Sequence, residues 1–382
     1  MSLPPLVEPG PPLRAEQVER YSRHVLLPGI GEQGQRRLAA ARVLVVGAGG
    51  LGAPVLTYLA AAGVGTIGVV DDDVVDTSNL QRQVVHGTDD VGRPKVDSAV
   101  DALARLNPLV TVVPHRERLT ADNALEVLAG YDLVVDGADN FPTRYLVSDA
   151  CSLLGVPEVW GSVFRFDAQV SVFWAGHGPT YRDLFPEPPP PGAVPSCAEG
   201  GVLGAMVGAV GSVMATEAVK LVTGAGEPLL GRLLVLDALA MTWRTVTVRP
   251  DPHAAPVTSL TDAAAACAPA PPALGPDAVV DAPTLARWLQ AGDVDVVDVR
   301  GEEEAALVSI PGSRVVPLPG ILSGDAIAEL PRDRRTVLYC KSGVRSAQAL
   351  QVLRGHGYDQ VVHLDGGVLA WVRDVDPTLP TY

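Results

Sequence analysis

The sequence predicts two α/β domains. The first has a doubly wound sheet that ends in a mixed part, and the second domain is smaller. Apolar runs alternate with helical stretches over residues 42–136, and these runs are continuous, as in parallel strands buried on both faces. The 382 residues also exceed what one core usually supports. An Ala/Pro-rich stretch separates the halves, so we predict domains over residues 14–250 and 278–382 and a linker over 251–277.

Helices and strands are expected in a βα order along the first domain. Two short helices, broken at the Gly/Pro stretch "LPGIG", precede the sheet within residues 14–40. The sheet then reads as strand, glycine turn, helix and strand over residues 41–73, helix Lys95–Leu106, strand Val110–Pro114, helix Ala121–Ala129 and strand 131–140. Strands in "QVSVFWAG" and "RLLVLDALAMTWRTVTVRP", on either side of an apolar helix over Gly201–Val222, predict the mixed part.

Composition and charge exclude several classes of protein. The net charge of −15 argues against sequence-independent binding of nucleic acid, which needs a Lys/Arg surface. No uninterrupted apolar run reaches the roughly 18 residues that span a bilayer. Residues 1–12 lack the basic and apolar regions of a signal peptide. We therefore expect a soluble, cytoplasmic protein that binds neither nucleic acid nor a membrane.

The four cysteines are too scattered for a disulfide framework or a zinc site. They are Cys151, Cys197, Cys267 and Cys340, and no two of them form a C-x-x-C pair. Each is therefore expected to be either a buried small side chain or a nucleophile.

A glycine-rich turn predicts a phosphate-binding site. The run Gly47–Gly52 follows a strand and opens a helix, so backbone amides and the positive helix end face an anion. Asp71 follows the next strand about 20 residues later, where an acid typically binds ribose hydroxyls. These features fit NAD as well as ATP, so an NAD-dependent oxidoreductase stays an alternative at this point.

Polar residues after further strands favour ATP. Arg82 in "SNLQRQ" and Lys95 in "GRPK" lie past strand ends, where cations neutralise a triphosphate and the charge that develops at phosphorus. Dehydrogenases do not need these cations. Asp139 and Asn140 end another strand, which is the position for a carboxylate that holds Mg²⁺. The seven histidines form no cluster, and we interpret His86 as an ordinary residue.

Five separated motifs occur in order over about residues 15–250, namely "GAGGLG", "DDDVVDTSNLQRQ", "VGRPK", "DGADN" and "CAEGGVLG". Together they resemble the MoeB/ThiF family of E1-like adenylyltransferases, which has a Rossmann-like adenylation domain. The resemblance implies that ATP adenylates the C-terminal glycine carboxylate of a small ubiquitin-like sulfur carrier protein. It implies an ATP site lined by Gly50, Asp71, Ser78, Asn79, Leu80, Gln81, Arg82, Lys95, Asp139 and Asn140, in a homodimer whose Arg23 reaches across from the other subunit.

The second domain has a smaller α/β order and carries a cysteine loop. "VDVVDVR", "TVLYC" and "QVVHLDGG" read as strands and "SAQALQVLRGHGY" as a helix. The loop of Cys340, Lys341, Ser342, Gly343, Val344 and Arg345 aims N–H groups inward and stabilises a thiolate or persulfide anion. With "IPGS" and "HLDGGVLAW", the segment resembles a rhodanese. Rhodanese-like phosphatases have one more residue between Cys and Arg, so the shorter loop favours sulfur transfer.

The two resemblances together match MoeZ-like fusions and imply one reaction sequence. ATP·Mg²⁺ converts the terminal carboxylate of the carrier to an acyl-adenylate. A persulfide on Cys340, supplied with sulfur by a cysteine desulfurase or thiosulfate, then attacks it. Cys197 is expected either to form a thioester or to resolve the acyl disulfide. An oxidoreductase with an appended rhodanese and an inactive carrier-binding scaffold stay as alternatives, and the sequence leaves the carrier and its pathway open.

We expect no zinc. In most members of the family, a C-x-x-C pair before the proline-rich arm binds zinc with a second such pair near the end of the domain. Here the first pair is Thr180 and Asp183, and the later segment "RPDPHAAPV" has no cysteine. Thr and Asp cannot replace thiolates in a tetrahedral zinc site. Packing by Tyr181, Leu184 and Phe185 is therefore expected to hold the arm.

Overall fold

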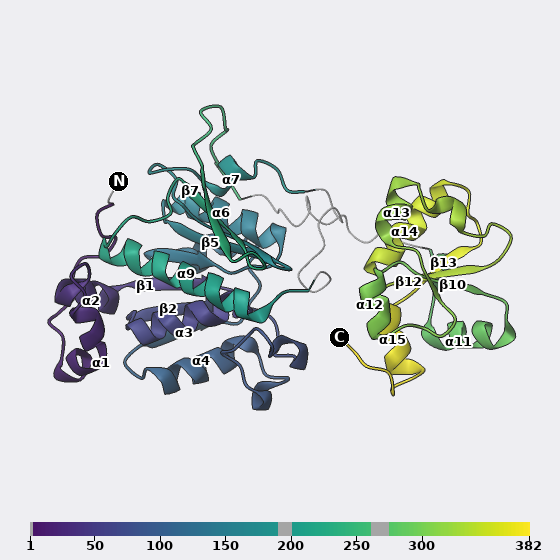
Figure 1. Cartoon of the computed structure of the whole chain (residues 1–382), viewed down its shortest axis with the longest axis horizontal. Helices are drawn as coiled ribbons and strands as arrows, with labels where there is room; N and C mark the ends of the chain where they lie inside the picture. The colour runs from purple at the N-terminus through teal and green to yellow at the C-terminus, as the bar shows by residue number, and fades with distance from the viewer. Residues whose placement is uncertain (1–2, 190–200, 261–274) are drawn as a thin grey trace. The chain divides into compact units, whose positions relative to one another are not determined.

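The computed structural model of the chain describes residues 3–189, 201–260 and 275–382 and forms two compact units, divided between residues 267 and 268 (Figure 1). Each unit is described by itself. The division falls within the predicted linker, whose extent stays a prediction. Cys197 and Cys267 lie outside the described residues.

The first unit alternates strands and helices around one large sheet. Its strands are β1 (Arg42–Val46), β2 (Thr66–Val70), β3 (Thr111–His115), β4 (Leu133–Asp136), β5 (Glu158–Phe164), β6 (Asp167–Phe173), β7 (Arg232–Asp237) and β8 (Thr242–Thr247). Its helices are α1 (Ala15–Val25), α2 (Gly31–Ala40), α3 (Gly52–Ala62), α4 (Lys95–Leu106), α5 (Ala124–Leu128), α6 (Phe141–Leu154), α7 (Tyr181–Leu184) and α9 (Gly204–Thr223), with 3-10 turns η1 (Thr77–Asn79) and η2 (Thr88–Asp90).

The sheet of the first unit reverses its strand order at β1. The strands lie in the order β3-β2-β1-β4-β5-β6-β7-β8, with the first five parallel and the last three antiparallel. The chain builds outward from β1 to β3 and then returns to the other side of β1 with β4. Ligands of such sheets bind beyond the carboxyl ends of the strands at this reversal. The turns after β1 and β4 therefore mark the expected site.

Helices cover both faces of the parallel strands. Val43 and Val45 of β1 pack in one core with α3 and α9. Leu44 and Val46 pack in another core with α5 and α6. Successive side chains of a strand point to opposite faces, so the unbroken apolar run of β1 supplies both cores. This two-sided burial is what its sequence predicts.

Helix α9 is the one helix among the described residues that is long and apolar enough to cross a membrane by length and composition. In this fold, Val207, Val210 and Met214 of α9 lie in the core of the sheet. Figure 1 shows α9 running alongside α3. Its burial is that of a core helix.

Most predicted elements occur where expected, but several elements of the first unit were not predicted. Helix α4 has the predicted bounds, whereas the helix expected over Ala121–Ala129 is shorter and α9 begins three residues later than expected. The sequence did not predict α6 and β5, nor the short helix α7 and the 3-10 turns η1 and η2. Helix α6 turns Arg144, Ser148 and Asp149 inward, and β5 begins with a buried glutamate, so neither shows a clean apolar pattern.

The second unit is a smaller parallel sheet with helices on both faces. Its strands are β9 (Val279–Val280), β10 (Asp295–Asp298), β11 (Arg314–Val315), β12 (Thr336–Tyr339) and β13 (Val361–Leu364), in the order β11-β10-β12-β13-β9. Its helices are α11 (Ala282–Ala291), α12 (Glu302–Leu307), α13 (Leu318–Ser323), α14 (Val344–Gly355) and α15 (Gly367–Asp374), with 3-10 turns η3 (Pro276–Ala278) and η4 (Ile327–Glu329). Central strand β12 ends directly before Cys340, so the loop begins at the carboxyl edge of the sheet.

Two carboxyl groups are buried on the α6 face of the first sheet. Asp136 ends β4 and Glu158 begins the neighbouring β5, both without exposed surface. Neither oxygen of Glu158 and only one of Asp136 has a hydrogen-bond partner. Burial, and then the nearby Asp136, raises the pKa of Glu158 well above its ordinary value. Burial also raises the pKa of Asp136, to about 6. Burial and the neighbouring Asp136 thus both favour the neutral form of Glu158.

A pH series tests this buried pair. Because the folded-state pKa of Glu158 is raised, the folded chain holds a proton that the unfolded chain loses above about pH 4.3. The free energy of unfolding should then fall by about 1.4 kcal/mol per pH unit until the folded-state pKa is passed. Glu158→Gln, a neutral side chain of similar shape, should flatten this slope and stabilise the protein at high pH.

The measurement is urea unfolding of the full chain, followed by tryptophan fluorescence at several pH values. The matched control is Glu126→Gln, because Glu126 is an exposed glutamate on α5. This control should leave the slope unchanged. An unaltered slope in Glu158→Gln would contradict a neutral, buried Glu158.

Candidate functional site

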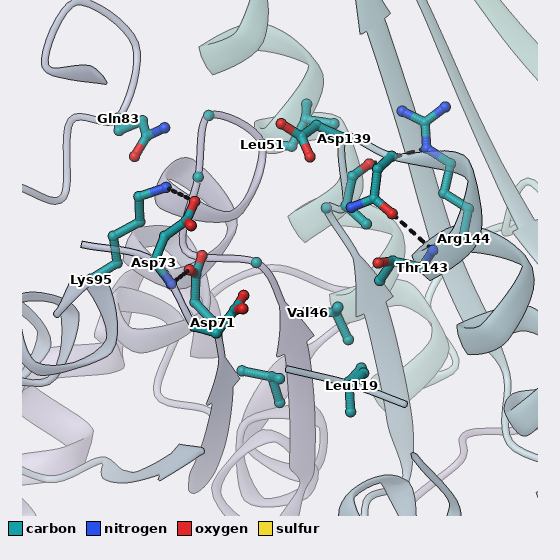
Figure 2. A pocket seen from close by; sticks show the side chains of 18 of the residues that line it. Val46, Leu51, Asp71, Asp73, Gln83, Lys95, Leu119, Asp139, Thr143 and Arg144 are labelled. Carbon is teal, nitrogen blue, oxygen red and sulfur yellow. Dashed lines mark hydrogen bonds and ion pairs between the residues drawn. The ribbon is translucent and has the colours of Figure 1, made fainter. Parts of the chain in front are cut away.

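A cavity of about 330 Å³ lies at the reversal of the strand order (Figure 2). The turns after β1, β2 and β4 line it. Six residues predicted from the sequence contribute to its wall: Gly50, Asp71, Arg82, Lys95, Asp139 and Asn140. Figure 2 shows Asp139 on one side of the cavity and Asp71, Asp73 and Lys95 on the other.

The turn after β1 requires glycine at two positions. Gly47 has φ of 88°, and its N–H donates to the carbonyl oxygen of Val70 at 2.8 Å. A β-carbon on Gly52 would overlap the carbonyl oxygen of Gly47. Helix α3 therefore begins tightly against the turn, with its N-terminus at the cavity. This is the arrangement that binds phosphate groups.

Asp71 is fixed at the end of β2 by two backbone amides. Its carboxylate accepts from Ala48 N and from Asp73 N, each at 2.8 Å. Burial raises the pKa of Asp71, opposed by Lys95 and by these two hydrogen bonds. The contact with Ala48 joins β2 to the glycine turn, so the acid and the turn form one rigid wall.

The two cations lie near each other in sequence but differ in their surroundings. Lys95 is only 6% exposed, and its Nζ donates to Asp73 Oδ2 at 2.8 Å. Arg82 is half-buried and donates through Nη1 to the carbonyl oxygen of Ser78 at 3.0 Å. Both side chains line the cavity. An incoming phosphate group would compete with Asp73 for the Lys95 ammonium.

The turn after β4 supplies the opposite wall. Asn140 caps α6, with its side-chain oxygen accepting from Thr143 N at 2.9 Å. Asp139 is exposed beside it. Arg144 Nε donates to the carbonyl oxygen of Ala138 at 3.0 Å, and its guanidinium lies 5.8 Å from the ring centre of Trp160. The cap and the cation thus fix the turn that carries Asp139.

Several predicted residues lie outside the cavity wall: Ser78, Asn79, Leu80, Gln81 and Arg23. The first four shape the segment that carries Arg82, whose N–H donates to the carbonyl oxygen of Asn79 at 3.0 Å. Arg23 is exposed on α1. Its predicted role concerns a second subunit, which a single chain does not test.

Other residues of the wall were not predicted from the sequence: Asp73, Gln83, Glu117, Arg118, Thr143 and Arg144. Gln83 directly follows Arg82 and is 4% exposed, with a side-chain oxygen that has no hydrogen-bond partner. A buried unpaired acceptor beside a cavity is a candidate ligand contact. Asp71, Asp72 and Asp73 also bring carboxylate oxygens within 4.8 Å of one another, which offers a cation a second set of oxygens besides Asp139.

His86 has a structural role. Its ring nitrogens lie 2.8 Å from Ser98 Oγ and 3.0 Å from the carbonyl oxygen of Ala48. Burial lowers the pKa of His86, so the ring is neutral. It ties the glycine turn to α4, which begins with Lys95. Among the residues that the structure describes, no histidine lines the cavity.

Residues 180–185, where the proline-rich arm begins, are joined to Asp251 by the carboxylate of Asp183. Asp183 Oδ2 accepts from Thr180 N at 2.6 Å and from Thr180 Oγ1 at 2.9 Å. Its Oδ1 accepts from Asp251 N at 2.7 Å, across 68 residues of sequence. Tyr181 is buried among Tyr145, Trp160 and Phe173, with Leu184 and Phe185 packed against that cluster. The Asp183 side chain thus joins residues 180–185 to Asp251 by a hydrogen bond, and aromatic packing holds residues 181–185 in place.

The cysteine loop of the second unit surrounds a buried sulfur. Cys340 is 1% exposed, and its Sγ accepts from Gly343 N at 3.1 Å. Gly343 has φ of 96°, so the tight turn favours glycine there. Ser346 Oγ of α14 lies 3.8 Å from Sγ. Arg345 donates to Glu304 of α12 through both terminal nitrogens, at 2.6 and 2.9 Å.

Comparisons with known proteins agree with this geometry. Residues 21–257 match the ThiF family, and residues 281–374 match the rhodanese-like domain. The chain is 54% identical to the probable adenylyltransferase/sulfurtransferase MoeZ of Mycobacterium tuberculosis, over 100% of this chain and 99% of that protein. It is 57% identical to the sulfur carrier protein adenylyltransferase of Thermus thermophilus, over 62% of this chain and 90% of that protein.

Solved structures support the fold. The chain resembles the crystal structure of E. coli MccB with a TM-score of 0.57 at 21% sequence identity, covering 63% of this chain and 74% of that one. The matches together fit an ATP-using adenylyltransferase joined to a sulfurtransferase, and they leave the oxidoreductase alternative without support. The chain belongs to the ThiF family and continues into a rhodanese-like domain.

Proposed function

We propose that the first unit adenylates the C-terminal glycine carboxylate of a ubiquitin-like sulfur carrier protein, and that a persulfide on Cys340 then converts it to a thiocarboxylate. The observation that supports the first step is the cavity at the strand reversal, which Arg82, Lys95 and Asp139 all line. The name of the Thermus relative supports a sulfur carrier protein as the substrate.

Adenylation needs charge cancellation and alignment more than a general base, because the attacking carboxylate is already ionised. The glycine turn offers backbone amides to the phosphates, and Lys95 and Arg82 offset their charge. Asp139 on one wall and the group of Asp71, Asp72 and Asp73 on the other offer oxygen ligands to Mg²⁺. Bound Mg²⁺ supplies positive charge to the phosphate oxygens. This chemistry agrees with the absence of histidine from the described residues of the cavity wall.

Sulfur transfer then follows in successive steps. Cys340 takes a sulfur atom from thiosulfate, which releases sulfite, or from the persulfide of a cysteine desulfurase. The terminal persulfide sulfur attacks the acyl carbon, AMP leaves, and an acyl disulfide forms. The thiolate of Cys197 attacks Cys340 Sγ, which releases the carrier thiocarboxylate and leaves a Cys197–Cys340 disulfide. A thiol reductant restores both cysteines. A direct thioester on Cys197 is the competing role of that residue.

We also propose how the protein assembles and where it works. We propose a cytoplasmic homodimer in which Arg23 reaches the ATP site of the other subunit, with no bound nucleic acid or membrane. We also propose that the protein holds no zinc, because Thr180, Asp183 and Asp251 already satisfy one another by hydrogen bonds. Elemental analysis that found one zinc per chain would contradict this.

Pyrophosphate exchange tests the adenylation step. The full chain should exchange pyrophosphate into ATP only with a carrier ending in Gly-Gly, and it should not turn over NAD(H). Lys95→Ala should slow exchange about 100-fold or more, because the cation offsets charge at phosphorus. The matched control is Arg105→Ala, which removes an exposed cation at the far end of α4.

Two results would count against adenylation. Absence of exchange with any Gly-Gly carrier would favour the inactive scaffold. Equal losses in Lys95→Ala and Arg105→Ala would show that the cavity is not the site.

Cys340→Ala separates the two steps. Removing the thiol deletes the sulfur acceptor of the second unit but leaves the cavity of the first unit intact. We expect normal pyrophosphate exchange and no thiocarboxylate, measured by the mass of the carrier. Cys151→Ala is the matched control, because Cys151 is buried in the first unit and its pKa is raised by burial. If Cys340→Ala abolished exchange as well, the assignment of one step to each unit would be wrong.

A further inference from the structure

The segment after α15 brings Tyr382 to the cysteine loop. The Tyr382 hydroxyl donates to Glu304 Oε1 at 2.8 Å and accepts from Arg300 Nη1 at 2.5 Å. Its ring lies under the Lys341 ammonium, 4.5 Å from the ring centre. In Figure 1 the end of the chain lies beside α12, which carries Glu304. Tyr382 thus contacts the loop through its ring, whereas its hydroxyl contacts Glu304, the ion-pair partner of Arg345.

One end of this network is rigid. Arg300 is fully buried and donates to both oxygens of Asp298, which is also fully buried. Arg300 Nη2 also donates to the carbonyl oxygen of Val308 at 2.7 Å. A buried, fully hydrogen-bonded ion pair has little freedom to move. Arg300 is therefore a fixed point for the Tyr382 hydroxyl.

The other end is the loop itself. Glu304 accepts from both terminal nitrogens of Arg345, the last residue of the loop. Burial alone would raise the pKa of Glu304, but hydrogen bonds from Arg345 and Tyr382 outweigh it and leave that pKa below its ordinary value. Glu304 is thus a carboxylate held between the Tyr382 hydroxyl and the Arg345 guanidinium.

We propose that Tyr382 is a positioning residue for sulfur transfer, and that its ring and hydroxyl hold Lys341 and the Glu304–Arg345 pair in place around Cys340. The inference rests on the proposed role of Cys340. It adds a residue that lies 42 positions beyond Cys340 in the sequence and outside the loop.

The charges around Cys340 explain why such positioning matters. Lys341 and Arg345 lie on the loop, Glu304 on α12, and the buried His363 on β13 contacts Ser346 at 3.4 Å. Burial lowers the pKa of His363, so that ring is neutral. Glu304 offsets Arg345, which leaves the Lys341 ammonium to attract an anionic donor or stabilise a persulfide anion. The ring of Tyr382 keeps that ammonium beside the loop by a cation–π contact.

Two substitutions separate the contacts of Tyr382. Tyr382→Phe keeps the ring beneath Lys341 and removes the hydroxyl that joins Arg300 to Glu304. Tyr382→Ala removes both. In full-length protein, kcat/KM for sulfur transfer from thiosulfate to cyanide should fall about tenfold in Tyr382→Ala and less in Tyr382→Phe. Thr381→Ala, at an exposed neighbouring residue, is the matched control and should match the wild type.

A double-mutant cycle distinguishes positioning from mere stability. If the ring acts through Lys341, Tyr382→Ala should cost much less in the Lys341→Ala background than in the wild type. Alkylation of Cys340 by iodoacetamide, measured on its peptide by mass spectrometry, should slow in Tyr382→Ala in parallel with kcat/KM. Thermal unfolding of each variant shows that the compared proteins are folded. If Tyr382→Ala does not fold, a lowered kcat/KM in Tyr382→Phe still supports the hydroxyl's role.

Wild-type kcat/KM and alkylation in both folded variants, or full additivity with Lys341→Ala, would overturn the inference. These outcomes differ from failure of the proposed function. A wild-type chain that takes no sulfur from any donor would refute the role of Cys340, yet the alkylation rates would still test whether Tyr382 acts on its thiol.

Discussion

The reversal of strand order at β1 is the constraint on which the first site depends. Strands β1 and β4 are neighbours, but the chain leaves β1 toward β2 on one side and leaves β4 toward β5 on the other, so the turns at their carboxyl ends diverge. The opening between them becomes the cavity. Gly47, Gly52 and the hydrogen bonds of Asp71 then keep one wall in place, and the Asn140 cap of α6 keeps the other.

Much of this could be predicted because short local patterns determine it. Glycines between strand and helix, and the polar residues at strand ends, identify Gly50, Asp71, Lys95 and Asp139 from the amino-acid sequence alone. Gln83 and Arg144 could not be found in this way, because their inward orientation depends on packing against distant elements. The Asp183–Asp251 contact and the approach of Tyr382 to Arg300 span 68 and 82 residues and have no local signal.

Charged and polar groups surround the site in both units, but they differ in kind. In the proposed reaction, the first offers cations and glycine amides to the phosphate chain of ATP, and its acids are close enough together to hold a metal ion. The second surrounds one sulfur with a backbone amide and a pair of loop cations whose charge is partly offset by Glu304. Both place their reactive groups just beyond the carboxyl ends of central parallel strands, where loops can vary without disturbing the sheet.

We propose that this one chain both activates a carrier protein and transfers sulfur to it. The most direct measurement is the intact mass of a purified Gly-Gly carrier after incubation with the full-length chain, ATP, Mg²⁺, thiosulfate and a thiol reductant. The account predicts a carrier in which one oxygen has been replaced by sulfur, formed only when ATP and thiosulfate are both present. A carrier of unchanged mass, despite active pyrophosphate exchange, would contradict it.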